Sequence, residues 1–565
     1  MIVLGIHSGH DSSAAIIIDG KIIADVQEER FTRVKHSSNV PIYSIQYCIK
    51  AAGIADINAI DYISLSWENN PRGLNTLFGI TDNYSSKEKV AINIARTFFG
   101  KSLGMKYEKL PIYYPDYTNY DKAKIINNNH HLVHAASAYF TMPSNEKCLI
   151  FTIDGAGDNT CTAIWVAEGN KIQLLQKYYK EASIGWAYSV VTEGLHWIHG
   201  DGEGKTMGLA PYGDYKKCKG VLDKYFPKFE NEKLVKESEL GNSYYWTESG
   251  STQFHFDEAK EVKSLIEKYG RENIAAEAQR LLEENVLNLV YGWVKKTGIK
   301  KIACAGGIFL NVKLNQRIWN NRGDLIEQQH IYPNPGDSGL AVGAAFLQYY
   351  KYNDFKGYKL NNLYFGPEYS NSEIEELLKI RKLNYKYIDD APQKAAELLA
   401  DNKIVAWFQG RMESGPRALG NRSILMSPLK AENKDIINSK VKFREAFRPF
   451  CPSLLYEYKD VYLDDNREEL FMITSFNVKN EKKYKIPAVV HVDGTVRPQM
   501  VKKEINPLYW ELINNFGKLT GEYIVLNTSF NVKGEPIINT PQEAIRCFFD
   551  SGLDAIFLGN YLLEK

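Results

Sequence analysis

VLGIHSGHDSSAAIIIDGKIIA, residues 3–24, and IFTIDGAGDNTCTAIWVAEGNKIQL, residues 150–174, share the order strand, Gly-rich turn, strand, turn, strand. Each copy has small polar residues after its first strand, where a backbone without bulky side chains lets a phosphate approach. The pattern predicts an internal duplication whose two loops form a nucleotide-binding cleft. The alternative is two unrelated hairpins, because hairpins with glycine turns are common. Aligning the stretches superposes three pairs of identical residues: Ile6 and Ile153, Asp11 and Asp158, Ile17 and Ile164.

The composition is that of a globular protein with large buried cores. The chain has 565 residues, 44% of them hydrophobic, and this length predicts two or three domains. A net charge of +1 gives no general attraction for nucleic acid, which argues against a duplex-binding protein. No stretch approaches the roughly 18 apolar residues of a membrane span, and the N-terminus lacks the basic region of a secretory signal. We therefore expect a cytoplasmic protein with no membrane partner. The seven scattered cysteines include no Cys-x-x-Cys pair and predict buried thiols.

Apolar strands alternate with helical stretches along the chain, which predicts an α/β fold. A long helix is expected at residues 274–298. Residues 350–370 are rich in Tyr, Asn, Gly and Lys without periodicity, and this composition predicts a linker. We therefore place a first domain at residues 1–360 and a second at residues 373–565. Residues 214–262 are polar and aromatic, and we interpret them as an insertion at the mouth of a cleft.

NNNHHLVHAASAYF, residues 127–140, contains the strongest metal-binding signal. His130 and His134 are four residues apart at the start of a predicted helix, so both imidazoles lie on one face and can bind one metal ion. A third ligand must come from a distant segment, and our candidate is Asp337, in a Gly/Pro turn before another predicted helix. Two imidazoles and a carboxylate suit iron, manganese or zinc. A histidine pair at this spacing is otherwise a helix-capping or surface feature, so the prediction depends on its surroundings.

Other Gly-rich turns carry polar residues. ACAGGIFLN, residues 303–311, is a predicted strand that ends at Gly306 and Gly307, with Asn311 beyond it, and it suits a ribose or a phosphate. DGEGKTMGLAPYG places Lys205 among four glycines, more than a solvated surface loop requires.

Two stretches near the C-terminus, residues 410–425 and 439–453, concentrate basic residues among glycines, prolines and aromatics. Guanidinium groups bind phosphate oxygens two at a time, so the pattern predicts converging phosphate clamps. The alternative is a basic, solvated surface. Arg497, Ser529 and Asn531 lie in polar stretches that we expect to complete the pocket, with Ser529 and Asn531 on one side of a strand end. The six basic residues are Arg411, Arg417, Arg422, Lys442, Arg444 and Arg448.

Nine motifs in this order resemble those of the bacterial O-carbamoyltransferases that act on nodulation factors and on antibiotics such as tobramycin and cephamycin. The resemblance covers nearly the whole chain. It implies an α/β fold whose N-terminal part is similar to the TsaD proteins, with the duplicated fold of actin and the sugar kinases, and whose C-terminal part is similar to YrdC. The motifs are HSGHDSSAAI, EERFTRVKH, HHLVHAASA, GEGKTMGLAPYG, AGGIFLN, PGDSG, MESGPRALGNRS, FREAFRPF and NTSFN.

The resemblance implies two linked sites. In the YrdC-like site, carbamoyl phosphate loses its phosphate, and the carbamate attacks the α-phosphorus of ATP, which binds with Mg(2+), to give carbamoyladenylate. In the TsaD-like site, a metal such as Fe(2+) holds this intermediate, and a hydroxyl of a small-molecule or glycan acceptor takes the carbamoyl group. The identity of the acceptor stays open, and residues 214–262 are the candidate region for its selection.

The resemblance also implies roles for individual residues. His10 is the expected base, and Lys35, otherwise an ordinary solvated lysine, is expected to stabilise the leaving adenylate. The expected metal ligands are His130, His134 and Asp337. Carbamoyl phosphate and nucleotide are expected at Arg417, Lys442, Arg448, Arg497, Ser529 and Asn531. Carbamoyladenylate is expected in the first domain at Asp154, Gly155, Lys205, Gly306, Gly307 and Asn311.

Two other functions stay open at this point. The same two folds, in separate chains, make threonylcarbamoyladenosine on transfer RNA, but the near-zero net charge argues against a nucleic-acid partner. The second is a non-catalytic, actin-like nucleotide switch, in which the arginine cluster has no use. The oligomeric state is also open, and a homodimer is the default expectation because symmetric dimers are the commonest assemblies.

Overall fold

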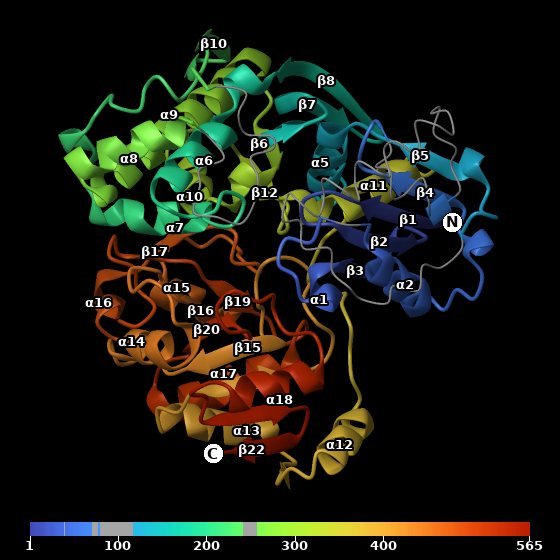
Figure 1. Ribbon diagram of the computed structural model, residues 1–565, viewed down its shortest axis with the longest axis vertical. Coiled ribbons are helices and arrows are strands. Elements are labelled where there is room, and N and C mark those ends of the chain that lie inside the picture. Colours follow the sequence, from blue (N-terminus) through green and yellow to red (C-terminus); the bar gives the residue numbers. More distant parts are fainter. Residues whose placement is uncertain (39, 70–76, 79–116, 241–256) are drawn as a thin grey trace, which may run out of the picture.

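The protein is described by a computed structural model, which places all residues except 39, 70–76, 79–116 and 241–256. Besides two small two-stranded sheets, the described residues form three large sheets, two of five strands and one of eight, each covered by helices (Figure 1). All three sheets combine parallel and antiparallel pairs. The expected α/β class is therefore confirmed. We call residues 2–349 the N-terminal part and residues 371–564 the C-terminal part.

The two five-stranded sheets of the N-terminal part have the same topology, which confirms the internal duplication. In each sheet the first three strands form an antiparallel meander, and the fourth and fifth strands extend it in parallel on the other side of the first strand. Asp11 and Asp158, paired by the sequence alignment, both have left-handed backbone, with φ of 60° and 46°. One sheet has the order β3 (Lys21–Gln27), β2 (Ser13–Ile18), β1 (Ile2–His7), β4 (Tyr62–Leu65), β5 (Ile125–Asn127). The other has the order β8 (Lys171–Tyr178), β7 (Thr160–Glu168), β6 (Cys148–Gly157), β11 (Lys301–Ala305), β12 (Gln328–Ile331).

Two helices lie between these sheets and bring their loops together. Helix α5 (His130–Tyr139) packs against β6 and β11, while α11 (Leu340–Tyr349) packs against β1 and β2, and the two helices pack against each other. The sequence of α11, LAVGAAFLQY, is apolar around most of its circumference, as a helix buried on all sides requires. Because His130 begins α5 and Asp337 lies just before α11, both helix N-termini carry predicted metal ligands.

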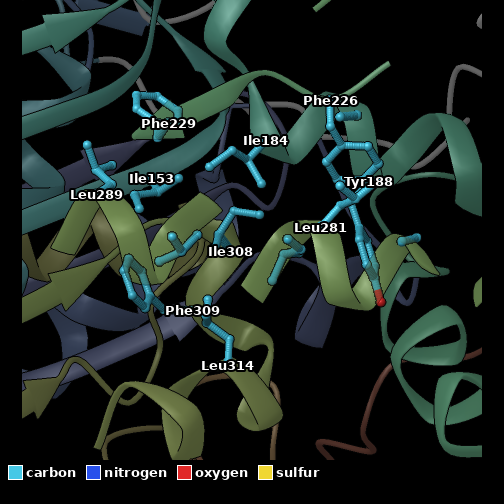
Figure 2. Close-up of a cluster of buried hydrophobic side chains, with 14 of the residues drawn as sticks. Ile153, Ile184, Tyr188, Phe226, Phe229, Leu281, Leu289, Ile308, Phe309 and Leu314 are labelled. Carbon is cyan, nitrogen blue, oxygen red and sulfur yellow. The ribbon is translucent and has the colours of Figure 1, made fainter. Parts of the chain in front are cut away.

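The outer face of the second sheet is covered by long helices. Ile153 of β6 packs there with Ile184, Leu289 and Phe309 in a continuous core (Figure 2). The described part of residues 214–262 packs against these helices, and residues 241–256 lie outside the described residues. The elements are α6 (Ile184–Gly194), α7 (Glu203–Leu209), β9 (Lys228–Glu230), β10 (Lys233–Lys236), α8 (Glu258–Tyr269), α9 (Arg271–Thr297) and α10 (Val312–Asn320).

The C-terminal part is built on the eight-stranded sheet, which lies below both other sheets in Figure 1. One hydrophobic cluster fills the face covered by α13 (Ala391–Ala400) and α17 (Pro507–Thr520). A second cluster includes residues of α12 (Asn371–Ile380) and α18 (Pro541–Phe549). Residues 350–370 contain no helix or strand. The strand order is β13 (Lys386–Tyr387), β22 (Tyr561–Glu564), β21 (Ala555–Leu558), β14 (Val405–Phe408), β15 (Arg422–Met426), β20 (Ile524–Ser529), β16 (Cys451–Leu455), β19 (Gln499–Val501).

All seven cysteines are buried and none forms a disulfide, as the sequence predicts. Five lie in the N-terminal part and two in the C-terminal part: Cys48, Cys148, Cys161, Cys218 and Cys304, then Cys451 and Cys547. No helix in the described part of the chain combines the length and apolar character needed to cross a lipid bilayer.

Candidate active sites

The predicted metal ligands converge where the two five-stranded sheets meet. His130 Nε2 lies 3.6 Å and His134 Nε2 lies 3.4 Å from Asp337 Oδ1. A fourth residue, Asp154 of β6, brings Oδ2 to 3.2 Å from His134 Nε2. One ligand atom from each of these four residues lies within 4.8 Å of the others. The structure therefore joins the three predicted ligands and adds Asp154, which the sequence assigned to nucleotide binding.

The hydrogen bonding of this cluster is incomplete in the way a metal site requires. His130 is buried, and among the described residues neither of its ring nitrogens has a hydrogen-bond partner. Burial holds the pKa of His130 well below its usual range, which favours the neutral form that binds metals. Burial also opposes charge on His134, but the adjacent carboxylates of Asp154 and Asp337 raise its pKa to about 9. Two imidazoles and two carboxylates form a donor set that fits a divalent metal such as Fe(2+).

Local structure fixes the orientation of the histidines. The side chain of Asn129 accepts a hydrogen bond from Leu132 N and caps α5, so that the helix begins at His130. Gly157 is required opposite His130, because a Cβ atom there would lie 2.1 Å from His130 Cδ2. His131 points away from this cluster, and its ring bonds Thr152 Oγ1 and the Thr160 carbonyl oxygen, each at 2.9 Å.

The duplication places His7 of β1 and Asp154 of β6 at equivalent positions. The alignment that sets Ile6 on Ile153 also sets His7 on Asp154. His7 Nε2 lies 3.7 Å from Asp337 Oδ2 and 2.9 Å from the His10 carbonyl oxygen, while Nδ1 lies 2.7 Å from Ser66 Oγ. The two equivalent positions therefore face the same carboxylate.

His10 and Lys35 belong to a charged cluster beside the metal ligands. His10 Nδ1 lies 3.0 Å from Asp11 Oδ2, and His36 Nδ1 lies 2.8 Å from Asp11 Oδ1. Asp201 pairs with Lys35 and lies 3.3 Å from His36 Nε2. Burial opposes charge on His36, but hydrogen bonds to Asp11 and Asp201 raise its pKa to about 10. Burial likewise opposes charge on His10, and Asp11 raises the pKa of His10.

The residues that the resemblance assigns to carbamoyladenylate in the first domain do not form one cluster. Some hold the Asp154 carboxylate, and others bond elsewhere in the protein. Gly155 N and Gly307 N donate to the carboxylate of Asp154, at 2.7 and 3.1 Å, and so orient this carboxylate toward the histidines. Gly306 N donates to the Pro335 carbonyl oxygen at 2.7 Å.

The two remaining members of this set bond elsewhere. Asn311 caps α10 and exchanges hydrogen bonds with Gln279, so both ends of its amide are occupied within the protein. Lys205 reaches the C-terminal part instead, where Nζ lies 3.7 Å from Glu445 Oε1.

The predicted phosphate residues of the C-terminal part gather at the ends of neighbouring strands. Lys442 Nζ donates to Asn531 Oδ1 at 2.7 Å and to Ser529 Oγ at 3.3 Å. Arg497 donates to Cys451 Sγ at 2.8 and 3.0 Å. Lys442 ends a π-helical turn, Asn438–Lys442, while Ser529 ends β20 and Asn531 follows it.

This pocket carries positive charge without matching negative charge. Of its five cations, only Arg448 pairs with a carboxylate among the described residues, 3.8 Å from Glu445. Burial, followed by repulsion from Arg497, lowers the pKa of Arg417 to about 9. Burial, followed by repulsion from Arg448, lowers the pKa of Arg444 to about 9. Such a group of cations is completed by an anion with several oxygens. The five cations are Arg417, Lys442, Arg444, Arg448 and Arg497.

Two of the six predicted clamps do not belong to this pocket. Arg411 donates to the backbone carbonyls of Ile23, Phe365 and Gly366 and joins the two parts of the chain. Arg422 is fully buried and donates to the carbonyls of Gln409, Asn421 and Pro367. Their Gly/Pro surroundings in the sequence are the same as those of Arg417, so composition alone does not separate guanidinium groups that bond backbone carbonyls from those in the cation pocket.

The sequence analysis also missed Asp11, His36 and Asp201 as partners of His10 and Lys35. The signal for His36 was present, since it follows Lys35 directly in the motif EERFTRVKH. Asp11 was noticed only as part of the repeat. Asp201 opens the Gly-rich motif that contains Lys205, and no spacing rule linked it to a residue 165 positions earlier in the chain.

Two family profiles and two nodulation proteins match this chain over most of its length. The family profile described as "Carbamoyltransferase N-terminus" matches residues 2–346, and the one described as "Carbamoyltransferase C-terminus" matches residues 396–565. The chain is 35% identical to Nodulation protein NolNO of Sinorhizobium fredii, over 98% of this chain and 79% of that protein. It is also 35% identical to Nodulation protein NolO of Bradyrhizobium diazoefficiens, over 77% of this chain and 79% of that protein.

A solved structure with partial similarity is that of HypF from T. kodakarensis. The match has 12% sequence identity and a TM-score of 0.33, and it covers 62% of this chain and 47% of that one. This similarity is too low to support a functional argument.

Proposed function

Because the chain belongs to the carbamoyltransferase family, we propose that it makes carbamoyladenylate from carbamoyl phosphate and ATP and then transfers the carbamoyl group to a hydroxyl. The acceptor is a hydroxylated small molecule or glycan. We assign the first step to the C-terminal part, as a YrdC-like domain at residues 373–565, and the second to a TsaD-like domain at residues 1–360.

The observation that carries this proposal is the group of unpaired cations in the C-terminal part. Arg417, Lys442, Arg444 and Arg497 form no ion pair with a described carboxylate, and burial lowers the pKa of Lys442 well below its usual range. Removing such charges from water is costly unless anionic ligands compensate them. The phosphates of carbamoyl phosphate and ATP supply that negative charge, and planar guanidinium groups match phosphate oxygens in pairs.

The first step needs charge neutralisation more than a protein nucleophile. Loss of phosphate from carbamoyl phosphate, with water, gives carbamate. A carbamate oxygen then forms a bond to the α-phosphorus of ATP, and the bond to the bridging oxygen breaks, so pyrophosphate leaves with its electron pair. In this proposal Arg417 and Arg497 hold the phosphoryl oxygens on which negative charge accumulates. Lys442 Nζ donates to Ser529 and Asn531, and these contacts support its position in the pocket.

The second step needs a base beside the carbamoyl carbon. His10 Nδ1 is oriented by Asp11, so the imidazole keeps the lone pair of Nε2 for the hydroxyl proton. The hydroxyl oxygen forms the new bond to the carbamoyl carbon, and AMP leaves with the electron pair of the broken bond. Lys35 and the protonated His36 supply positive charge for that leaving group.

The metal cluster completes the transfer site. His130, His134, Asp154 and Asp337 would hold Fe(2+) or another divalent metal. When bound, the metal supplies positive charge for phosphate and carbonyl oxygens of the intermediate.

The two sites lie close enough to exchange a labile intermediate. Asp201, which pairs with Lys35, is also one of the charges that raise the pKa of Arg448 against the larger effect of burial. Lys205 bridges from the N-terminal part to Glu445, which pairs with Arg448. We propose that carbamoyladenylate formed at the arginine pocket passes directly to His10, because direct transfer would limit its hydrolysis in bulk water.

The test separates the two steps. Pyrophosphate release from ATP and Mg(2+) is measured with and without carbamoyl phosphate, and we expect release only when carbamoyl phosphate is present. Lys442→Ala should slow this release on the order of 100-fold, because it removes a fixed positive charge from the reacting phosphates. Lys440→Ala is the matched control, since Lys440 is exposed in the same π-helical turn. The proposal would be overturned if both variants lost pyrophosphate release equally. It would also be overturned if pyrophosphate release were the same with and without carbamoyl phosphate.

The transfer step is tested with His130→Ala. We expect this variant to lose bound metal and to stop carbamoylating acceptors, which mass spectrometry detects as the gain of one carbamoyl unit across a panel of hydroxylated compounds. Its pyrophosphate release should stay at the wild-type rate. If metal analysis finds full occupancy in this variant, His130 is not a ligand.

A further inference from the structure

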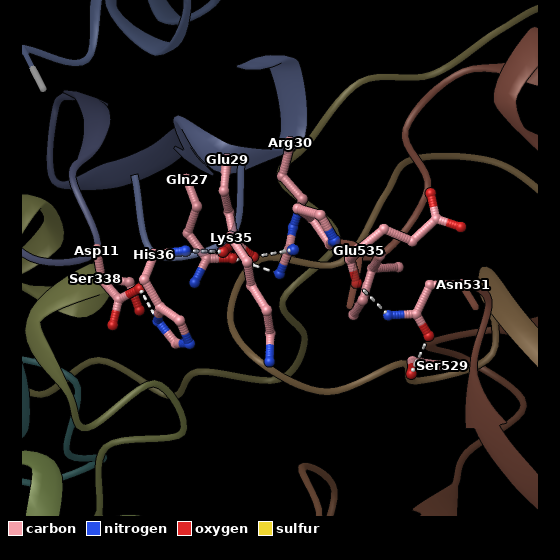
Figure 3. Close-up of polar contacts among 12 residues, drawn as sticks. Asp11, Gln27, Glu29, Arg30, Lys35, His36, Ser338, Ser529, Asn531 and Glu535 are labelled. Carbon is pink, nitrogen blue, oxygen red and sulfur yellow. Dashed lines mark hydrogen bonds and ion pairs between the residues drawn. The ribbon is translucent and has the colours of Figure 1, made fainter. Parts of the chain in front are cut away.

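Residues 27–36 run from the end of β3 through α1 (Glu29–Thr32) and touch both candidate sites (Figure 3). At one end, His36 binds Asp11 and Lys35 pairs with Asp201 in the transfer site. Earlier in the segment, Arg33 donates to the carbonyls of Pro536 and Ile537, each at 2.8 Å, in the loop that follows Asn531. One short segment therefore carries groups of the transfer site, the cluster around His10, Lys35 and the metal ligands. It also contacts a loop beside the anion pocket, which is our name for the group of Arg417, Lys442, Arg444, Arg448 and Arg497.

A buried ion pair between Glu29 and Arg30 connects His36 to the backbone near Arg417. The carboxylate of Glu29 pairs with the guanidinium of Arg30, and its other oxygen accepts a hydrogen bond from His36 N at 2.9 Å. Arg30 Nη2 donates to the Gly415 carbonyl oxygen at 2.8 Å and to Gln27 Oε1 at 2.5 Å. Only 2% of Arg30 is exposed to solvent. A buried pair contributes little net stability, so its fixed geometry is the more important property.

Gly415 links the Glu29–Arg30 ion pair to both candidate sites. It lies two residues before Arg417 of the anion pocket, and its φ of 89° is one that residues with a side chain rarely adopt. A Cβ atom at Gly415 would lie 3.3 Å from Asn334 Cβ. Asn334 in turn accepts a hydrogen bond from Ser338, the neighbour of Asp337. The backbone at Gly415 is therefore fixed between the Arg30 guanidinium and the loop that carries a metal ligand.

We propose that Arg30 is a positioning residue that couples the two sites, so that an anion bound beside Arg417 orders the His36 end of the segment through Gly415, Arg30 and Glu29. The inference rests on the proposed function, because it requires the arginine pocket to bind the phosphates of the first step. Such coupling completes the transfer site only when an adenylate is being formed. It would limit hydrolysis of the intermediate.

Hydrogen–deuterium exchange of peptides that cover residues 28–37 tests this coupling, with pyrophosphate as the probe. In the wild-type protein, saturating pyrophosphate should slow exchange at the His36 amide about fivefold or more. Arg30→Lys keeps the charge but cannot bond Glu29, Gln27 and the Gly415 carbonyl together. This variant should still bind pyrophosphate, measured by calorimetry, and should lose the slowing.

Arg411→Lys is the matched control. Arg411 is another arginine that joins the two parts of the chain through backbone carbonyls, but its described bonds do not include residues 27–36. The slowing should persist in this variant. If Arg30→Lys fails to fold, judged by circular dichroism, Glu29→Gln provides the same test, because a neutral amide weakens the bond to Arg30.

The outcomes separate the two proposals. Pyrophosphate binding without any slowing in the wild type, or equal slowing in wild type and Arg30→Lys, would overturn the coupling and leave the proposed function intact. Absence of pyrophosphate binding in the wild type would overturn both. Loss of the slowing in Arg30→Lys and Arg411→Lys alike would show a general loosening between the two parts of the chain, which also contradicts a specific role for Arg30.

Discussion

His134 Nε2 lies 3.2 Å from Asp154 Oδ2, although His134 belongs to a helix between the sheets and Asp154 belongs to the first strand of the second repeat. Amide groups of Gly155 and Gly307 hold that carboxylate in place. The contact makes Asp154 a candidate metal ligand in addition to the carbamoyladenylate role that the resemblance implies.

Asp154→Asn should therefore lower metal affinity by about tenfold or more, because an amide oxygen carries no full charge. Titration of the apoprotein with Fe(2+) under anaerobic conditions, in competition with a chelator, gives the affinity. Asp158→Asn is the control from the same loop, since among the described residues the hydrogen bonds that Asp158 accepts come from the backbone N–H groups of Glu68 and His130. Equal affinity in wild type and Asp154→Asn would remove Asp154 from the ligand set.

Gly157→Ala should disturb the same site without removing a donor atom. The new Cβ would overlap the His130 ring, with 2.1 Å to Cδ2, so the imidazole must move away from Asp337. We expect reduced metal content by elemental analysis and an otherwise folded protein. Gly204→Ala is the control, because its Cβ would meet no atom within 4 Å. Full metal content in Gly157→Ala would mean that the ring has room to shift without consequence.

The burial of the Asp25 carboxyl predicts a pH-dependent stability. Burial raises the pKa of Asp25 to about 7, against an ordinary value of 3.8 and despite the hydrogen bond from Ser414. Between these values the folded state holds a proton that the unfolded state has lost. The free energy of unfolding therefore falls as pH rises through this window, by about 1.4 kcal/mol per pH unit for this group.

Asp25→Asn removes this dependence, and Asn retains an oxygen that accepts from Ser414. Denaturant unfolding at about pH 5 and about pH 8 should show a smaller difference in the variant than in the wild type. A remaining slope is expected from Glu469, another buried carboxyl whose pKa burial raises to about 7. Parallel pH dependences in the two proteins would show that Asp25 does not carry a proton in the folded state.

Asp11 should set the titration of His10. Because Asp11 raises the pKa of His10 against the opposing effect of burial, Asp11→Asn lowers this pKa, and His10 becomes neutral at a lower pH. The backbone tolerates the change, since Asp11 has a φ of 60° and asparagine adopts left-handed conformations readily. Carbethoxylation modifies only neutral imidazole, so the pH midpoint of His10 labelling, followed by mass spectrometry, should move down. Asp19→Asn, beside the N-terminal amine, should leave the midpoint unchanged.

Much of the fold could be predicted because it depends on local patterns. The repeated strand and turn pattern predicted two sheets of one topology, and the i, i+4 spacing of His130 and His134 placed both rings on one helix face. The predicted helix at residues 274–298 corresponds to α9, Arg271–Thr297. Each of these features is determined by residues close together in sequence.

The rest of the candidate sites depends on contacts between distant segments. Asp154 joins the histidines only because β6 packs against α5, and Asp201 reaches His36 only because the Gly-rich loop turns toward the first sheet. Arg417 and Arg422 have similar neighbours in sequence, yet Arg422 lies at the start of a central strand and donates to backbone carbonyls. The register of the sheet decides which guanidinium groups remain available to bind an anion. The sequence pattern does not contain that information.

The burial of all seven cysteines makes thiol labelling a measure of how the molecule opens. A reagent can modify these side chains only when the surrounding sheet separates, so the labelling rate of each peptide follows the local unfolding equilibrium around it. Cys451 and Cys547 report on the C-terminal part of the chain, and the other five cysteines report on the N-terminal part. A ligand that stabilises one part alone would then slow the modification of the cysteines in that part and leave the others unchanged.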